Sequence, residues 1–140
     1  MELCVLMLVV TPKETIPTGL HFNDCNVAQD VLRYQWNKGR YHVQIDIICY
    51  EGIWTGGVSI MANTAGMGSP VGRPTRMCSE DEMFGTIGFP TFNSAVAHYL
   101  SFARKWIKCD GSRDLYPWLE QCKELTEKDF VETRNIYGRL

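Results

Sequence analysis

Apolar and polar residues alternate along the segment from position 41 to position 50. Every second residue is apolar or aromatic, and polar side chains stand between most of them: Tyr41, Val43, Ile45, Ile47 and Cys49 alternate with His42, Gln44 and Asp46. This period of two is typical of a strand that buries one face. Glu51 and Gly52 supply a tight turn, and a second apolar segment returns. The pattern therefore predicts one β-hairpin over residues 41–62.

A helical pattern precedes the hairpin. Asn23 or Asp24 can cap a helix, and apolar residues follow at i, i+4 spacing. Gly39, preceded by a lysine, is placed to end the helix as a C′ glycine. We expect this helix over residues 24–37.

The strongest helical pattern lies after the hairpin. Thr91 or Asn93 caps it, and an apolar stripe runs along one face. Three cations stand near its end, where they oppose the negative end of the helix dipole: Arg104, Lys105 and Lys108. This pattern predicts a helix over residues 92–108.

The other segments complete a small fold of the α+β class. We expect a buried strand and loop over 1–22, a Gly/Pro-rich loop over 63–75, a third short strand within 76–87, and short C-terminal helices over 115–125 and 126–137. The predicted architecture is a small antiparallel sheet, the hairpin 41–62 plus one or two further strands, packed against helices at 24–37 and 92–108. The chain is then a single domain, 1–140, with an α-β-β-(β)-α core over 23–109 and a helical C-terminal extension over 110–140.

Composition narrows the classes of function. With 45% hydrophobic and 21% charged residues, the chain has the make-up of a globular protein. Its net charge of −2 lacks the basic surplus that nucleic-acid binding usually requires. The apolar run at 3–10 is too short to cross a bilayer and has no cation before it, so we expect a cytoplasmic protein without membrane contact. Six widely spaced cysteines suit small buried hydrophobes in a reducing compartment.

The expected order of helix, strand, strand, possible strand and helix is that of the double-stranded-RNA-binding-like fold. The residues also resemble a small module of phage and plasmid mobile-element proteins. In that module an aromatic opens a strand, a glycine-tryptophan turn and a Gly/Ser/Pro loop follow, and a helix carries an early aromatic and alanine. The matching residues are Tyr41, Gly52, Trp54, Gly56, Gly57, Ser69, Pro70, Phe92 and Ala95. The resemblance implies a mobile-element origin and an α/β fold, and it transfers no active site.

One lone thiol has a possible catalytic interpretation. Cys25 follows the expected helix start, where free backbone N–H groups would favour its thiolate. Several papain-like and cell-wall amidase families present a nucleophile in this way, but they also need a histidine and a group that orients it. His42 and Asp46 are the candidates, although those families place the histidine much later in the chain. A structural cysteine is the simpler interpretation, so we expect no enzyme and keep a cysteine hydrolase only as a long shot.

The sequence does not favour a metal site, a cofactor site or a row of cations that would bind the phosphates of a nucleic acid. It contains no Cys-x-x-Cys, His-x-x-x-His or His-Glu-x-x-His spacing. The glycine-rich segment 66–74 lacks the Gly-Lys-Ser/Thr ending of a P-loop. The start of the 92–108 helix lacks the lysine cluster with which a double-stranded-RNA-binding domain holds phosphates. A DNA-associated accessory protein with a local basic patch is the alternative that ranks next after a non-catalytic protein-binding function and ahead of the hydrolase.

These observations leave a non-catalytic protein that binds another macromolecule by protein–protein contact. Together with the resemblance, they suggest an inhibitor of a host defence enzyme, such as an anti-CRISPR protein. Trp54 would anchor the interface, and the carboxylates at 80–82 would attract a basic nucleic-acid-binding enzyme. The expected partner-binding residues are Trp54, Met67, Ser69, Arg73, Glu80, Asp81 and Glu82.

Overall fold

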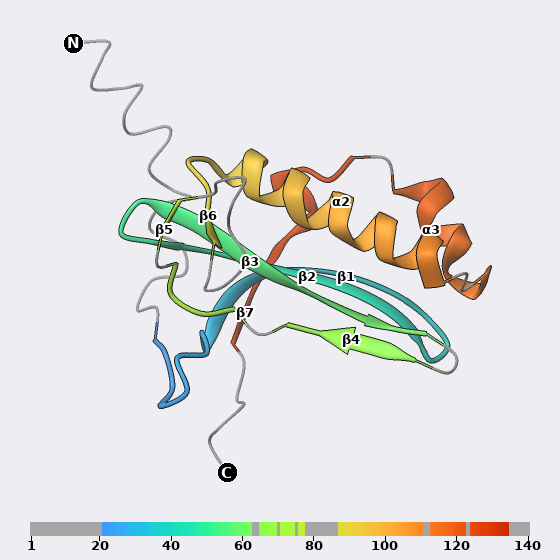
Figure 1. Cartoon of the computed structure of the whole chain (residues 1–140), viewed down its shortest axis with the longest axis horizontal. Coiled ribbons are helices and arrows are strands. Elements are labelled where there is room, and N and C mark those ends of the chain that lie inside the picture. The colour runs from blue at the N-terminus through green and yellow to red at the C-terminus, as the bar shows by residue number, and fades with distance from the viewer. Residues whose placement is uncertain are drawn as a thin grey trace, which may run out of the picture.

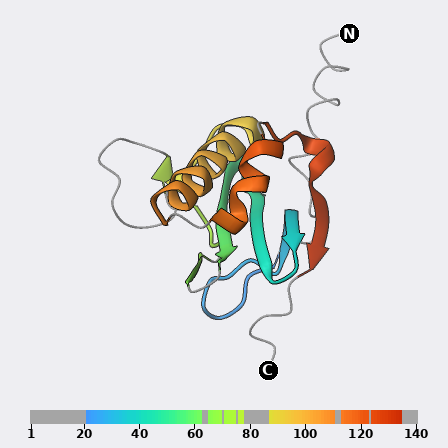
Figure 2. The same cartoon turned by 90° about the vertical axis from the view of Figure 1, so that its right-hand side faces the viewer.

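A computed structural model describes residues 21–62, 65–69, 71–74, 76–77, 87–110, 113–122 and 124–134. It contains a five-stranded antiparallel sheet with the strand order β4-β3-β2-β1-β7 (Figure 1). The strands are β1 (Asp30–Lys38), β2 (Tyr41–Tyr50), β3 (Ile53–Met61), β4 (Gly66–Gly68) and β7 (Val131–Arg134). Helices α2 (Phe92–Asp110) and α3 (Tyr116–Gln121) both lie on one face of this sheet (Figures 1 and 2). The α+β fold class is therefore confirmed.

The predicted hairpin is confirmed as β2 and β3. The register runs from Tyr50 opposite Ile53 to His42 opposite Met61, so the two strands pair along nearly their full length. Glu51 and Gly52 both have positive φ, 52° and 81°, as a type I′ turn requires. Apolar side chains of β2 face the helices because alternate residues of a strand point to opposite faces.

The predicted helix over 24–37 is wrong, because Asp30–Lys38 forms strand β1. Leu32 and Trp36 are four residues apart, which suits a helix, but they are also an even number apart, which suits one face of a strand. The register with β2, in which Leu32 lies opposite Ile47, decides the matter by tertiary pairing. Gly39 has a φ of 62° and belongs to the β1–β2 turn, not to a helix end.

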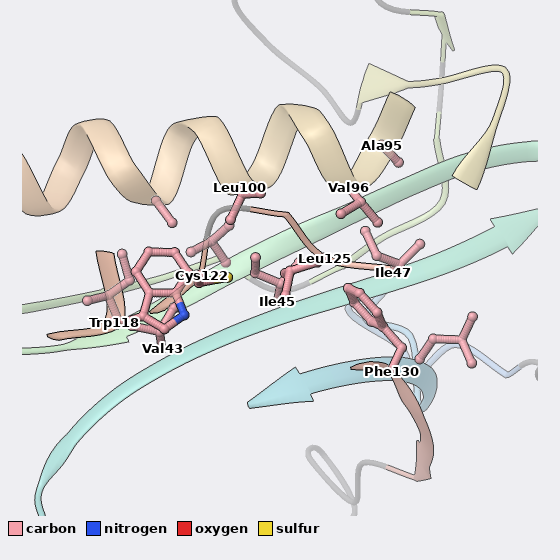
Figure 3. Packing of buried hydrophobic residues seen from close by; sticks show 14 of the residues in the cluster. Val43, Ile45, Ile47, Ala95, Val96, Leu100, Trp118, Cys122, Leu125 and Phe130 are labelled. Atoms are coloured by element: carbon pink, nitrogen blue, oxygen red, sulfur yellow. The ribbon is translucent and has the colours of Figure 1, made fainter. Parts of the chain in front are cut away.

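The predicted helix over 92–108 is confirmed as α2. Ser94 N–H donates to the Thr91 hydroxyl oxygen over 3.0 Å, so threonine caps the start of the helix as expected. Its buried stripe packs against β2 and β3, and Figure 3 shows Val96 and Leu100 directed toward Ile45 and Ile47 of the sheet. This contact forms the main core.

The C-terminal segment departs from the expected pair of helices. The first is confirmed in part as α3, which a 3-10 turn at Arg113–Leu115 precedes. The second is wrong: a 3-10 turn at Glu127–Asp129 leads into β7, which pairs with β1 and completes the sheet. Thr126 and Asp129 form a capping box at the start of this 3-10 turn, but it caps only one turn.

Two further strands lie within or next to the region where a third strand was expected. β5 (Arg76–Met77) and β6 (Ile87–Gly88) form a separate two-stranded parallel sheet. The expected strand at 3–10 falls outside the described residues. Among the residues that are described, no helix has both the length and the apolar character needed to cross a membrane.

Candidate binding surfaces

The candidate catalytic group of Cys25, His42 and Asp46 is not assembled. Residues 24–26 form a turn and a bend rather than the start of a helix, so the expected helix dipole behind Cys25 is absent there. The sheet register places His42 opposite Asn37, close to the β1–β2 turn, whereas Cys25 precedes the other end of β1. Nucleophile and base are thus separated by the length of a strand.

Asp46 is engaged with a different partner on the face of the sheet opposite the helices, which we term the open face. Arg33 of β1 lies opposite it, and its Nε and Nη2 donate to Asp46 Oδ1 and Oδ2 over 2.8 and 3.0 Å. Gln44 Nε2 donates to the same Oδ2 over 3.1 Å. The carboxylate is nine-tenths buried and accepts three hydrogen bonds, so it is committed to this contact.

The hydrogen bonds continue along the open face toward the β1–β2 turn. Gln44 Oε1 accepts from Gln35 Nε2 over 3.2 Å and lies 3.1 Å from His42 Nε2. His42 Nδ1 lies 2.5 Å from Asn37 Oδ1. The three cross-strand pairs on this face therefore form one connected network, which we term the polar ladder. It consists of Arg33, Gln35, Asn37, His42, Gln44 and Asp46.

The sequence pattern located half of this ladder. The period of two in β2 placed His42, Gln44 and Asp46 on one polar face, as observed. Their partners on β1 were missed because that segment was interpreted as a helix. The sequence signal for them is the alternation of Arg33, Gln35 and Asn37 with aromatic and aliphatic residues, which is typical of a strand.

Ser69, an expected partner-binding residue, lies next to the ladder. Its N–H donates to the Val58 carbonyl oxygen over 3.0 Å. Its own carbonyl oxygen passes so close to Gly57 that a Cβ there would collide with it. Because Gly57 lies opposite Asp46 in the sheet, the glycine lets Ser69 rest on the open face beside the carboxylate.

Arg73, another expected residue, lies at the far end of the open face. Its guanidinium stands 4.4 Å from the ring centre of Phe22 and 5.7 Å from that of Tyr50, a cation–π arrangement. Nearby, Ala28 N–H donates to the Val71 carbonyl oxygen over 2.7 Å. The segments at 21–28 and 71–74 thus cover this end of the sheet, whereas Gln35 and Asn37, toward the other end of the polar ladder, are exposed.

The remaining expected residues lie elsewhere. Trp54 is 4% exposed, exchanges backbone hydrogen bonds with Phe89 and packs edge-to-face on Phe92. It is a core residue and does not present its indole to a partner, which corrects the expectation of an exposed anchor. Met67 is half-buried and packs against the same core. The acidic run Glu80, Asp81 and Glu82 falls outside the described residues, so its role stays a prediction.

A second surface feature lies on the helical side of the molecule. A groove, the α2 groove, separates α2 from the segment 124–126, and its lining includes the three cations near the end of α2. Its lining consists of Asn93, Val96, Ala97, Leu100, Ser101, Arg104, Lys105, Lys108, Glu124, Leu125 and Thr126.

A thiol and a phenol are enclosed beneath α3. Trp118 Nε1 donates to the Tyr34 hydroxyl oxygen over 2.6 Å. Burial raises the pKa of Tyr34 well above its usual range, and burial likewise raises the pKa of the Cys122 thiol. Cys122 is therefore protonated and enclosed at neutral pH, which makes it a poor nucleophile.

Neither surface shows the geometry of a metal centre. Within the described part of the chain, no three His, Cys, Asp or Glu side chains converge as metal ligands would. Comparison of the chain with protein-family models, with curated proteins and with solved structures finds no match.

Proposed function

We propose that this protein is a non-catalytic binding protein that acts by protein–protein contact through the open face of its sheet. The observation that carries the proposal is the polar ladder. Its side chains are fixed by mutual hydrogen bonds on a sheet face that no described helix covers (Figure 1). A surface that is ordered before binding loses little entropy when a partner docks.

Residues beside the ladder have the character of an interface. Met61, opposite His42, is 52% exposed, and Val131, opposite Arg33, is 65% exposed. Each lies on the open face because directly paired residues of a sheet share a face. The ladder is thus flanked by apolar side chains, and methionine in particular is enriched in protein–protein interfaces.

The charges of the ladder favour a protein over a nucleic acid as the partner. Arg33 is the only arginine or lysine of the ladder, and Asp46 neutralises it through two hydrogen bonds. Nucleic-acid affinity depends on unpaired cations that replace counterions at the phosphates. A neutral, hydrogen-bonding surface with apolar flanks instead matches a partner protein with polar and apolar groups of its own.

The ladder also supports a non-catalytic role. His42 and Asp46, the two candidate catalytic groups on this face, are linked through Gln44 rather than to a nucleophile. A general base needs an open position at the proton that it removes. Both ring nitrogens of His42 already face side-chain oxygens.

Inhibition of a host defence enzyme is the specific form of binding that we propose. It rests on the resemblance to mobile-element proteins and on the acidic run at 80–82, which would attract a basic nucleic-acid-binding enzyme. Carboxylates of this kind raise the rate of association more than the final affinity.

A DNA-associated accessory role is the second candidate. It is favoured by Arg104, Lys105 and Lys108, which gather in the α2 groove on the opposite side of the sheet. Binding of a DNA duplex at physiological salt that is lost in a Lys105→Gln/Lys108→Gln variant would support this candidate over the first.

Affinity capture from the host, followed by mass spectrometry, tests the proposed function. The bait is the full chain in three forms: wild type, the open-face variant Gln35→Arg/Met61→Arg, and the control Gln121→Arg/Phe102→Arg. The control makes the same two kinds of substitution at exposed positions of α3 and α2.

We expect a protein that the wild type and the control retain and the open-face variant loses. Equal retention by all three forms would move the interface off the open face. Recovery of no protein above the background of the empty matrix would contradict a protein-binding function. Thermal unfolding of the three forms shows whether each variant is folded.

A further inference from the structure

We propose that the α2 groove binds an amphipathic anion, a ligand with an apolar body and a single anionic head group. The groove lies on the helical side of the sheet and is therefore separate from the open face. Its volume of about 690 Å³ is within the range of sites that hold small organic ligands.

The groove is apolar at one end. Val96 and Leu100 of α2 and Leu125 of the facing segment form its floor, and all three are buried against the main core (Figure 3). The apolar body of a ligand would rest on the small area of hydrocarbon that these side chains, 3%, 8% and 9% exposed, still present to the groove.

The other end of the groove is cationic. Arg104, Lys105 and Lys108 follow Leu100 on α2, at about 6 to 12 Å from it along the helix axis at the helical rise of about 1.5 Å per residue. These three cations face one carboxylate, Glu124, although the chain as a whole has a net charge of −2. The local charge therefore selects an anion.

Arg104 supplies an independent indication of a missing acceptor. Its Nη2 donates to the Cys122 carbonyl oxygen, which ties the segment at 122–126 to α2 and fixes the guanidinium at the groove. Its Nε is buried and has no hydrogen-bond acceptor among the described residues. Buried donors are nearly always paired, so Arg104 would gain the missing acceptor if a rotation of its side chain brought this N–H to a head group in the groove.

The distribution of charge separates this ligand from a nucleic acid. A phosphodiester chain needs cations repeated along its path, whereas here the cations are confined to one end of the groove. The apolar floor occupies the rest, and Glu124 would repel neighbouring phosphates. A ligand with one anionic head group and an apolar body matches both the cationic end and the apolar end of the groove.

Two dyes that share an apolar body test the proposal. The anionic probe is 8-anilinonaphthalene-1-sulfonate, and N-phenyl-1-naphthylamine is its counterpart without the sulfonate. Each is titrated by fluorescence against the full chain and against three variants: Lys105→Gln/Lys108→Gln removes the exposed cations, Ala97→Trp fills the groove, and Lys38→Gln/Arg40→Gln removes two exposed cations at the β1–β2 turn as a control.

We expect the sulfonate dye to bind the wild type and the control alike, and Lys105→Gln/Lys108→Gln to weaken it roughly tenfold. Ala97→Trp should abolish its binding, and the neutral dye should bind at least roughly tenfold more weakly than the sulfonate. Decanoate should displace the bound sulfonate dye, whereas decanol and a short DNA duplex should not.

Several results would overturn the proposal. Equal affinity for the two dyes would show an apolar surface without anion selectivity. An unchanged affinity in Lys105→Gln/Lys108→Gln, or in a folded Ala97→Trp variant, would place the dye elsewhere. Displacement by the duplex at physiological salt would assign the groove to phosphates of a nucleic acid. Circular dichroism establishes that each variant is folded.

Discussion

Arg33 and Asp46 form a two-point ion pair across β1 and β2, with Nε–Oδ1 and Nη2–Oδ2 distances of 2.8 and 3.0 Å. Their side chains are only 13% and 12% exposed. A guanidinium and a carboxylate in this planar geometry fix each other's orientation. Through Gln44 the pair also orients the rest of the polar ladder, so it sets the shape of the surface that we assign to partner binding.

Loss of one partner of this pair should destabilise the fold strongly. Asp46→Leu leaves the Arg33 guanidinium enclosed without a counter-charge, and we expect a loss of about 3–5 kcal/mol in the free energy of unfolding. The double variant Arg33→Met/Asp46→Leu should recover most of that loss, because no charge is then buried unpaired. Urea unfolding of the wild type, of Asp46→Leu, of Arg33→Met and of the double variant measures the coupling free energy between the two side chains. A double variant no more stable than Asp46→Leu would contradict this account of the pair.

Gly57 should tolerate no side chain. A Cβ there collides with the Ser69 carbonyl oxygen, so Gly57→Ala must displace Ser69 or β3, and we expect a loss of about 1–3 kcal/mol. Gly68→Ala is the matched control, since its Cβ would meet Ser59 Oγ at 3.4 Å, an ordinary contact. Thermal and urea unfolding of the two variants compare them. Equal stability of both would show that Ser69 does not lie against Gly57.

His98 should make the fold less stable in mild acid. Partial burial lowers the pKa of its imidazole below the usual 6.5, and Lys105 lowers the pKa further. The ring stands 4.8 Å from that of Phe89. Because the unfolded chain then takes up the proton more readily than the folded one, stability falls as the pH drops from about 6.5 toward the lowered pKa.

The variant His98→Gln isolates this contribution. The Tm of the wild type relative to the variant should decrease as the pH is lowered from about 7.5 to about 5, where an unperturbed imidazole would titrate. A difference in Tm that stays constant over this range would show that His98 has the same proton affinity in both states.

The sequence predicted the elements in which local pattern and tertiary pairing agree. The hairpin at 41–62 and helix α2 each have one period and matching turn or cap residues. The segment at 30–38 has spacings that fit both a helix and a strand, and only pairing with β2 and β7 decides between them. Tertiary pairing also decides the structure of Val131–Arg134. This strand is too short to show a period, and its place beside β1 defines it.

For the candidate surfaces, too, the local sequence pattern predicts one part and tertiary contacts decide the rest. His42, Gln44 and Asp46 were visible as one polar face, whereas their hydrogen-bond partners depend on the register of β1. Trp54 looked like an anchor because tryptophan is frequent in interfaces, but its edge-to-face contact with Phe92 joins residues far apart in the chain. The sequence indicates only that Arg104, Lys105 and Lys108 stand near the end of a helix, and the fold places Glu124 and Leu125 across the groove from them.

Side-chain amide signals offer the most direct test of binding through the open face. In the ¹⁵N-labelled protein, the NH₂ groups of Gln35, Asn37 and Gln44 report from the polar ladder, and that of Asn93 reports from α2 on the other side of the sheet. Titration with the captured partner, unlabelled, should shift or broaden the three ladder signals and leave the Asn93 signal in place. Changes confined to Asn93 and the backbone of α2, with the ladder signals unmoved, would contradict the proposed docking surface.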